Sequence, residues 1–95
     1  MKAVPARIVV DASLPRRVAA GLAAAGFEIV DGGAADLAVV SLPALARLRG
    51  VARAVVMADA EDVVSAFTAG ADDVVSPKID PAELAARVHA ILRRG

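Results

Sequence analysis

The chain contains no cysteine, no tryptophan and no tyrosine, and it has only one histidine among its 95 residues. Without cysteine it can form neither a disulfide nor a thiolate metal site, and His89 alone cannot build a histidine-based zinc site. The 11 Lys and Arg residues balance the 11 Asp and Glu residues, so the formal net charge is zero. Nucleic-acid binding depends on surplus positive charge facing phosphates. We therefore expect no metal, no cofactor and no nucleic-acid partner.

Long uninterrupted apolar runs are also missing, although 58% of the residues are hydrophobic. The longest stretches without charge, residues 18–27 and 37–46, are ten residues each and contain Gly or Pro, whereas a membrane-spanning helix needs about 20 apolar residues. Residues 1–11 do not resemble a signal peptide, because Asp11 ends the first apolar run too early. We expect a cytoplasmic chain without membrane association that forms one domain over residues 1–95.

Short valine-rich runs alternate with alanine-rich stretches of helical period. Four of the five runs lack the apolar/polar alternation of half-exposed strands, which indicates strands covered on both faces. The predicted strands are residues 7–10, 27–30, 37–40, 54–57 and 73–76. The predicted helices are residues 13–25, 43–49, 60–69 and 81–94. This order predicts an α/β fold, a doubly wound parallel sheet with helices on its faces.

The last two predicted helices carry clear local signals. Asp80 can cap the final helix, and Glu83, three residues later, completes a capping-box pattern. In the preceding helix we expect Val63, Val64 and Phe67 to point into the core. Each helix would then bury one apolar face against the sheet.

The connection between the second and third predicted strands is short. Only residues 31–36 separate them, and a crossover between parallel strands normally takes about a dozen residues or more. Six extended residues reach roughly 20 Å, so a taut crossover can just close the gap. The alternative is an antiparallel hairpin, favoured by the turn-like Asp31-Gly32-Gly33. In both arrangements one helix of a standard doubly wound fold is missing, and the apolar surface beneath it needs other cover.

The last third of the chain resembles the end of the receiver domain of bacterial response regulators, and most closely the subfamily that carries a winged-helix DNA-binding domain. The matching segment is residues 70–94, GADDVVSPKIDPAELAARVHAILRR. Weaker matches lie upstream, in order, at residues 7–11, 26–30 and 36–43. The resemblance implies a flavodoxin-like sheet of about five parallel strands in the order 2-1-3-4-5, with the helix between strands 2 and 3 missing.

The residues that carry receiver chemistry are altered in this chain. Receivers accept a phosphoryl group on an aspartate, with Mg²⁺ held by that aspartate and by an acidic pair after the first strand. Here Ser41 matches the acceptor position, and the acidic pair is reduced to Asp11 followed by Ala12. A lone carboxylate offers little to Mg²⁺, and a serine hydroxyl is a weak nucleophile without an activating base. The resemblance therefore implies a pseudo-receiver with no catalytic residue, and not an enzyme.

The former phosphoacceptor pocket is expected at the carboxyl edge of the sheet, where ligands of open α/β folds bind. Its candidate residues are Asp11, Ser41, Asp59 and Lys78. One interpretation is a residual polar pocket for an anion or metal. The interpretation we favour is that these residues stabilise the backbone of the loops locally, and that Asp59 caps a helix. The family's Lys-Pro step is reversed here as Pro77-Lys78, which displaces the ammonium group by one residue and predicts a solvated lysine.

The candidates for an interaction face are Asp73, Glu83, Arg87 and Arg94. In the resembled subfamily the fourth helix, fifth strand and fifth helix form a symmetric dimer joined by charged pairs, and Asp73 and Arg87 match one such pair. Glu83 matches another, but its expected lysine partner falls near Val63, so this face becomes more apolar. The alternative is that Glu83 and Arg87 form an i,i+4 pair on an exposed helix face.

Together these features predict a phosphorylation-independent pseudo-receiver that acts as a protein–protein interaction or dimerisation module in bacterial signalling or transcription regulation. Its partner would be another protein or a second copy of the chain. Two alternatives stay open. One is an atypical phosphoacceptor that uses Asp11, Asp59 or Ser41. The other is a domain that senses a small ligand or anion at the strand ends, although the turn after the first strand has no glycine to approach a phosphate.

Overall fold

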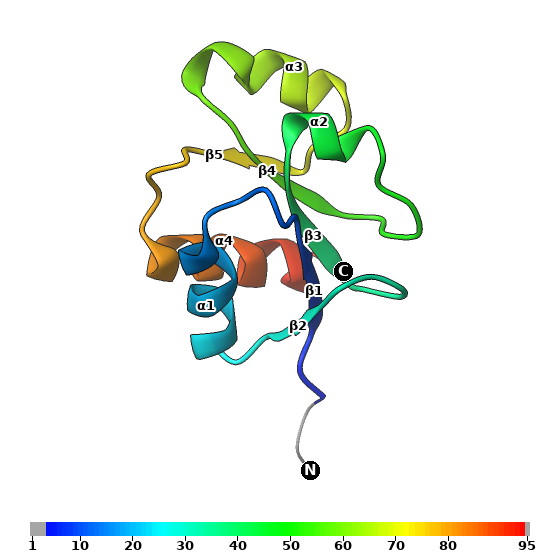
Figure 1. The fold of residues 1–95 in the computed structure, drawn as a ribbon, viewed down its shortest axis with the longest axis vertical. Coiled ribbons are helices and arrows are strands. Elements are labelled where there is room, and N and C mark those ends of the chain that lie inside the picture. Colours follow the sequence, from blue (N-terminus) through cyan, green and yellow to red (C-terminus); the bar gives the residue numbers. More distant parts are fainter. Residues whose placement is uncertain (1–3, 95) are drawn as a thin grey trace.

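The computed structural model describes residues 4–94, so the first residues of the segment compared with a signal peptide lie outside it. Its centre is a five-stranded sheet in the order β2-β1-β3-β4-β5, with helices on both faces (Figure 1). The strands are β1 (Arg7–Val10), β2 (Glu28–Val30), β3 (Leu37–Ser41), β4 (Ala54–Met57) and β5 (Asp73–Val75). The helices are α1 (Arg16–Ala24), α2 (Leu42–Leu45), α3 (Val63–Thr68) and α4 (Pro81–Arg93), and a 3-10 turn, Ala60–Asp62, precedes α3. The predicted α/β fold and strand order are confirmed.

All strand pairs are parallel, which shows that the hairpin alternative for the second strand is wrong. In the register, Ile8 of β1 lies opposite Ile29 of β2 and Leu37 of β3. The other half of the sheet pairs Val40 with Val56 across β3 and β4. Branched apolar side chains therefore run across the middle of the sheet, where they are covered on both faces.

The crossover from β2 to β3 contains no helix and consists of residues 31–36. Gly33 turns the chain with φ 76°, a left-handed conformation that glycine adopts without steric cost. Asp36 fixes the end of the crossover to the start of β1. Its N–H donates to the Arg7 carbonyl oxygen at 2.8 Å, and its Oδ2 accepts from the Arg7 N–H at 2.8 Å. These two bonds hold the taut connection in place.

One face of the sheet is covered by α1 and α4, which lie together on the same side in Figure 1. Fourteen buried residues form this larger core, among them Ile8, Leu22, Leu84 and Val88. The two helices approach closely where Gly21 of α1 faces Pro81, because a Cβ at Gly21 would lie 2.6 Å from the Pro81 Cβ. The small residue at this position lets the helices pack at short range.

The opposite face carries α2 and α3 (Figure 1) and a smaller core. Ala38, Val40, Val56 and Ala66 are buried there. Partly buried side chains pack against them from Val9, Leu42, Ala44, Leu45, Leu48, Val51, Ala58, Ala71 and Val74. Both helices are short, so loops supply much of the cover on this face.

The predicted inward face of α3 is wrong for Val64 and Phe67, whereas Val63 is partly buried. Val64 is 77% exposed and Phe67 is 47% exposed, whereas Ala66 is completely buried. The preceding 3-10 turn changes the phase at which the six-residue helix begins, because it winds more tightly than an α-helix. As a result Ala66, and not Phe67, faces the sheet.

The helix predicted over residues 43–49 is also shorter than expected and occupies only Leu42–Leu45. After it the chain leaves the helical path and places Leu48 and Val51 against the smaller core. These two side chains supply part of the cover that the missing crossover helix would otherwise give. Among residues 4–94, no helix combines the length and apolar character needed to cross a membrane.

The start of α4 is capped as predicted, because the Asp80 carboxylate accepts a hydrogen bond from the Ala82 N–H at 2.8 Å. Pro81 occupies a first-turn position, where its missing N–H has no cost. Glu83 turns toward Arg87 and binds it. The carboxylate expected to complete the capping box is therefore used in an ion pair on the outer face of the helix.

Candidate functional site

Asp11 and Ser41 meet at the carboxyl ends of the neighbouring strands β1 and β3. Asp11 directly follows β1, and Ser41 is the last residue of β3. The Ser41 hydroxyl donates to Asp11 Oδ2 at 2.7 Å, and the Ser41 N–H donates to the same oxygen at 3.1 Å. The structure thus brings these two predicted residues together at one edge of the sheet.

Ser13 supplies two further bonds to the same carboxylate. Its N–H donates to Asp11 Oδ1 at 3.1 Å and its hydroxyl donates to Oδ2 at 2.8 Å. A carboxylate has roughly four acceptor positions on its two oxygens. Asp11 Oδ2 accepts three hydrogen bonds, two from Ser41 and one from Ser13, whereas Oδ1 accepts one, from the Ser13 N–H. Oδ2 is therefore saturated within the chain, and Oδ1 retains one acceptor position.

The electrostatics of the site follow from these bonds. Partial burial acts to raise the pKa of Asp11, but the hydrogen bonds from Ser41 and Ser13 outweigh it and lower the pKa from 3.8 to about 2. The carboxylate is therefore charged throughout the physiological pH range. A group with so low a pKa is a poor general base.

Both residues also stabilise the local backbone, as our favoured interpretation of the sequence holds. The Asp11 bonds to Ser13 close the turn between β1 and α1. The Ser41 Oγ accepts from the Ala44 N–H at 3.3 Å and so caps α2. The sequence pattern Asp-x-Ser signals the first of these turns, but the predicted helix began at residue 13, whereas α1 begins at Arg16.

Asp59 and Lys78 are exposed, and no hydrogen bond or ion pair within residues 4–94 joins either of them to Asp11 or Ser41. Asp59 stands at the N-cap position of the 3-10 turn, but its side chain accepts no capping bond, contrary to expectation. Lys78 donates its backbone N–H to the Ser76 Oγ at 3.1 Å. Of the four candidate residues, only Asp11 and Ser41 are therefore joined by polar contacts. Within residues 4–94 no three Asp, Glu or His side chains lie close enough together to hold a metal ion.

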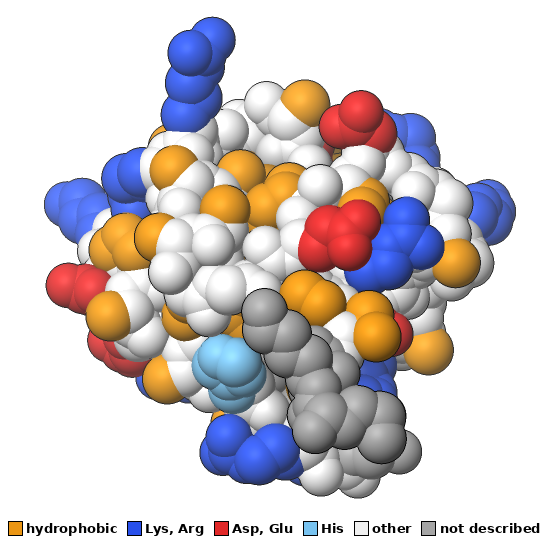
Figure 2. Space-filling view, turned by 90° about the horizontal axis from the view of Figure 1, so that it is seen from below, with side chains coloured by type: hydrophobic (Ala, Val, Ile, Leu, Met, Phe, Trp, Pro, Cys, Tyr) orange, Lys and Arg blue, Asp and Glu red, His pale blue; other side chains and the backbone are white. Residues whose placement is uncertain are grey.

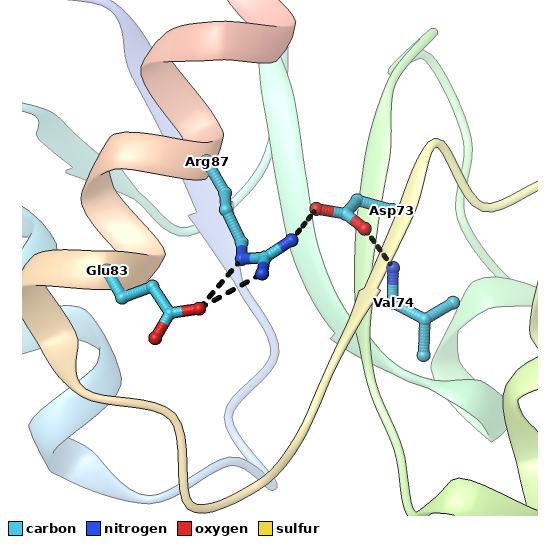
Figure 3. Close-up of polar contacts among 4 residues, drawn as sticks. All are labelled: Asp73, Val74, Glu83 and Arg87. Carbon is cyan, nitrogen blue, oxygen red and sulfur yellow. Dashed lines mark hydrogen bonds and ion pairs between the residues drawn. The ribbon is translucent and has the colours of Figure 1, made fainter.

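The predicted interaction face contains a charged cluster of three residues (Figure 3). Arg87 of α4 donates to Glu83 Oε2 at 3.0 and 3.2 Å and to Asp73 Oδ2 at 3.2 Å. The other Asp73 oxygen accepts from the Val74 N–H at 2.8 Å. The bonds from Glu83 and Asp73 raise the pKa of Arg87. The i,i+4 pair is thus present, and the same guanidinium also ties α4 to β5.

Arg94 stands apart from this cluster at the C-cap of α4, where it is exposed. Between β5 and the start of α4 the surface is hollowed by a groove of about 320 Å³. Its lining combines Val74 and Ile79 with Lys78, Glu83 and Arg87. The groove therefore places apolar surface beside the paired charges of Glu83 and Arg87 and beside the exposed Lys78.

Comparison with solved structures places this architecture among known folds. The BeF3-activated receiver domain of DrrB superposes with a TM-score of 0.72 at 20% identity, covering 95% of this chain and 99% of that one. A proposed response regulator from Chloroflexus aurantiacus gives a TM-score of 0.76 at 18% identity, with 95% and 99% coverage. The longer DrrB chain of Thermotoga maritima, an OmpR/PhoB homologue, gives 0.70 at 23% identity, covering 96% of this chain and 54% of that one. The chain has the receiver fold.

No protein-family description matches the chain, and no curated protein does. At 18–23% identity the structural likeness concerns the fold alone. Within the receiver fold, the serine–aspartate site lies at the edge of the sheet where the first and third strands end. The fold thus brings together these two residues from positions 30 apart in the chain.

Arg17 is a residue whose role the sequence did not indicate. From α1 its guanidinium donates to the carbonyl oxygens of Pro77 and of Ile79, the latter at 3.3 Å. It thereby ties α1 to the loop that precedes α4 in this receiver fold. An arginine on a helix surface gives no sequence signal for such a contact, because its partners are backbone atoms some 60 residues away.

Proposed function

We propose that this chain is a phosphorylation-independent pseudo-receiver that acts as an interaction or dimerisation module in bacterial signalling or transcription regulation, in the cytoplasm. The observation that carries the proposal is the hydrogen bond of 2.7 Å between Ser41 and Asp11. Ser41 matches the position at which receivers carry the phosphoacceptor aspartate. Its neutral hydroxyl is bound to Asp11, the carboxylate that phosphoryl transfer would need as a metal ligand.

The hydrogen bonds from the two serines to Asp11 support this assignment. Mg²⁺ demands near-octahedral oxygen ligands and depends on carboxylates to offset its dehydration. Here Asp11 Oδ2 already accepts three hydrogen bonds from the two serines, so a metal ion would reach this carboxylate only through Oδ1 or by displacing those bonds. The hydroxyl of Ser41 also has no adjacent base, because its partner carboxylate has a pKa of about 2.

The α3–β5–α4 face supports an interaction role. Val64 and Phe67 are the most exposed large apolar side chains of α3, at 77% and 47%. Asp73 of β5 and Glu83 and Arg87 of α4 are bound to one another, which lowers the cost of covering these charges. Exposed apolar side chains and paired charges are both features of protein interfaces.

Nucleic acid is a poor partner for such a surface. The net charge of the chain is zero. Figure 2 shows basic, acidic and apolar side chains intermixed on the end of the molecule that it views, without a field of one sign. A partner protein or a second copy of the chain fits this distribution better than a phosphate backbone does.

Phosphorylation is tested by incubating the intact chain with acetyl phosphate and Mg²⁺, and separately with beryllofluoride and Mg²⁺. We expect no phosphoryl adduct in the mass spectrum and no change of amide chemical shifts at Asp11, Ser41 or Asp59. The DrrB receiver domain, known in a BeF3-activated form, is the positive control. An adduct on the present chain would establish the atypical phosphoacceptor and overturn the proposal.

Self-association is tested by measuring molar mass in solution across concentration. We expect the mass to rise toward that of a dimer, and to stay monomeric in the variants Phe67→Lys and Val64→Lys, whose side chains are exposed and need not perturb folding. Asp73→Arg and Arg87→Asp test the charged cluster. The matched control is Arg16→Ala, an exposed change on α1. A monomer at every concentration would exclude homodimerisation.

A further inference from the structure

A second groove lies on the part of the sheet that the absent crossover helix leaves open. It has a volume of about 320 Å³ and is bounded by the crossover loop on one side and by the segment after α2 on the other. Known small-molecule sites occupy roughly 300–1,000 Å³. The groove is therefore large enough for a small metabolite.

Four branched aliphatic side chains supply the apolar part of this groove. They are Val9, Val40, Leu48 and Val51. Val40 is only 2% exposed, and the other three are partly buried against it. A ligand with a compact aliphatic side chain can extend this cluster and remove its remaining exposed apolar surface from water.

The charges around the groove come in both signs. Asp31 of the crossover and Arg47 after α2 line it, and neither side chain has a hydrogen-bond or ion-pair partner within residues 4–94. The other two charged residues of the lining are engaged within the chain. Asp11 is bound by the serines, and Arg49 donates to the Leu48 carbonyl oxygen at 2.9 Å.

We propose that this groove binds a free α-amino acid with a branched aliphatic side chain. Arg47 pairs with the carboxylate, Asp31 pairs with the ammonium group, and the aliphatic side chain packs on the valine and leucine cluster. Two aspartates and two arginines line the groove, so its formal charge is zero. A neutral zwitterion suits that balance, whereas a polyanion would meet two carboxylates. The site is separate from the α3–β5–α4 face and does not depend on the proposed function.

The test is a titration of the isotope-labelled chain with L-leucine, followed by amide and methyl chemical shifts. We expect saturable shifts at Val9, Val40, Leu48 and Val51, and similar behaviour with isoleucine and valine. 4-Methylpentanoate, which lacks the ammonium group, and isopentylamine, which lacks the carboxylate, should each bind at least about tenfold more weakly. Glycine, which lacks the side chain, should do the same.

Variants assign the two charges. Arg47→Ala and Asp31→Asn should each weaken leucine binding at least about tenfold, while Arg16→Ala on α1 should leave it unchanged. The absence of saturable shifts with about 10 mM of all three amino acids would overturn the proposal. Equal binding of leucine and 4-methylpentanoate would overturn it in favour of a simple anion site. These outcomes are separate from self-association, which is measured without any amino acid present.

Discussion

Replacing Gly21 by alanine tests how closely α1 and α4 pack. Gly21 lies inside α1, where alanine is normally favoured over glycine by about 1 kcal/mol. In this fold, however, the new Cβ would lie 2.6 Å from the Cβ of Pro81 and 3.5 Å from its Cγ. Carbon atoms prefer to stand about 3.5–4.0 Å apart. The helices must therefore separate or bend to admit one methyl group.

The two effects have opposite signs, and their magnitudes decide the outcome. Overpacking of a fitted contact costs about 1–3 kcal/mol, and the helical preference of alanine offsets about 1 kcal/mol of it. We expect Gly21→Ala to lower the free energy of unfolding by about 1 kcal/mol, with a fall in Tm of about 4–8 °C for a domain of this size. Urea unfolding followed by circular dichroism measures the first quantity, and a thermal scan measures the second.

A second background separates the clash from other causes. Pro81→Gly removes the Cβ that the new methyl group meets, at its own cost to the start of α4. In that background Gly21→Ala should raise the free energy of unfolding by about 1 kcal/mol, because only the helical preference remains. Ala20→Gly, at an exposed site on the same helix, calibrates that preference. Stabilisation of equal size in both backgrounds would refute the close approach of the two helices.

Three further predictions concern the polar contacts. Because the pKa of Asp11 is lowered, its contribution to stability is present above the ordinary pKa of 3.8 and is lost as the pH falls toward 2. The free energy of unfolding should fall by about 1 kcal/mol over this range, after allowance for solvent screening, and Asp11→Asn should abolish this fall. Ser41→Asp should lower the free energy of unfolding far more at pH 7 than at pH 3, because it places a second carboxylate beside Asp11. Ser41→Ala should lower it by about 1 kcal/mol at both pH values. Arg17→Ala should lower the free energy of unfolding by about 1 kcal/mol and speed amide exchange in the loop of Pro77 and Ile79. Unchanged exchange in that loop would contradict the role of Arg17.

The sequence predicted the sheet well because its signals are local and redundant. The valine-rich runs can be buried only as strands covered on both faces, and their number and spacing leave few arrangements. The choice between crossover and hairpin could not be made from the sequence. Both fit residues 31–36, and the structure decides it through the pairing of Asp36 with Arg7. Such a long-range contact has no periodic signature.

The orientation of α3 was not predictable for a related reason. Its six residues contain Val63, Val64 and Phe67, so several faces of the helix look apolar. The tighter 3-10 turn before it sets which face meets the sheet, and that turn is not marked by glycine or proline. The sequence also predicted that Asp11 and Ser41 lie at one edge of the sheet, whereas the bonds from Ser13 to Asp11 are signalled only by the local Asp-x-Ser pattern.

The short crossover also explains features that look unrelated in the sequence. With only residues 31–36 between β2 and β3, no helix can cover Val9 on that face of the sheet. Leu48 and Val51 pack on this face in place of the missing helix. Because the chain must leave the helical path to bring these two side chains to the smaller core, α2 is limited to four residues. Two loops cannot seal the surface as a helix would, so the groove remains between them. Lengthening the crossover with a helix-forming insert should therefore close the groove and displace Leu48 and Val51 from the smaller core. Amide exchange in residues 46–52 should then become faster, while the amides of the sheet stay protected.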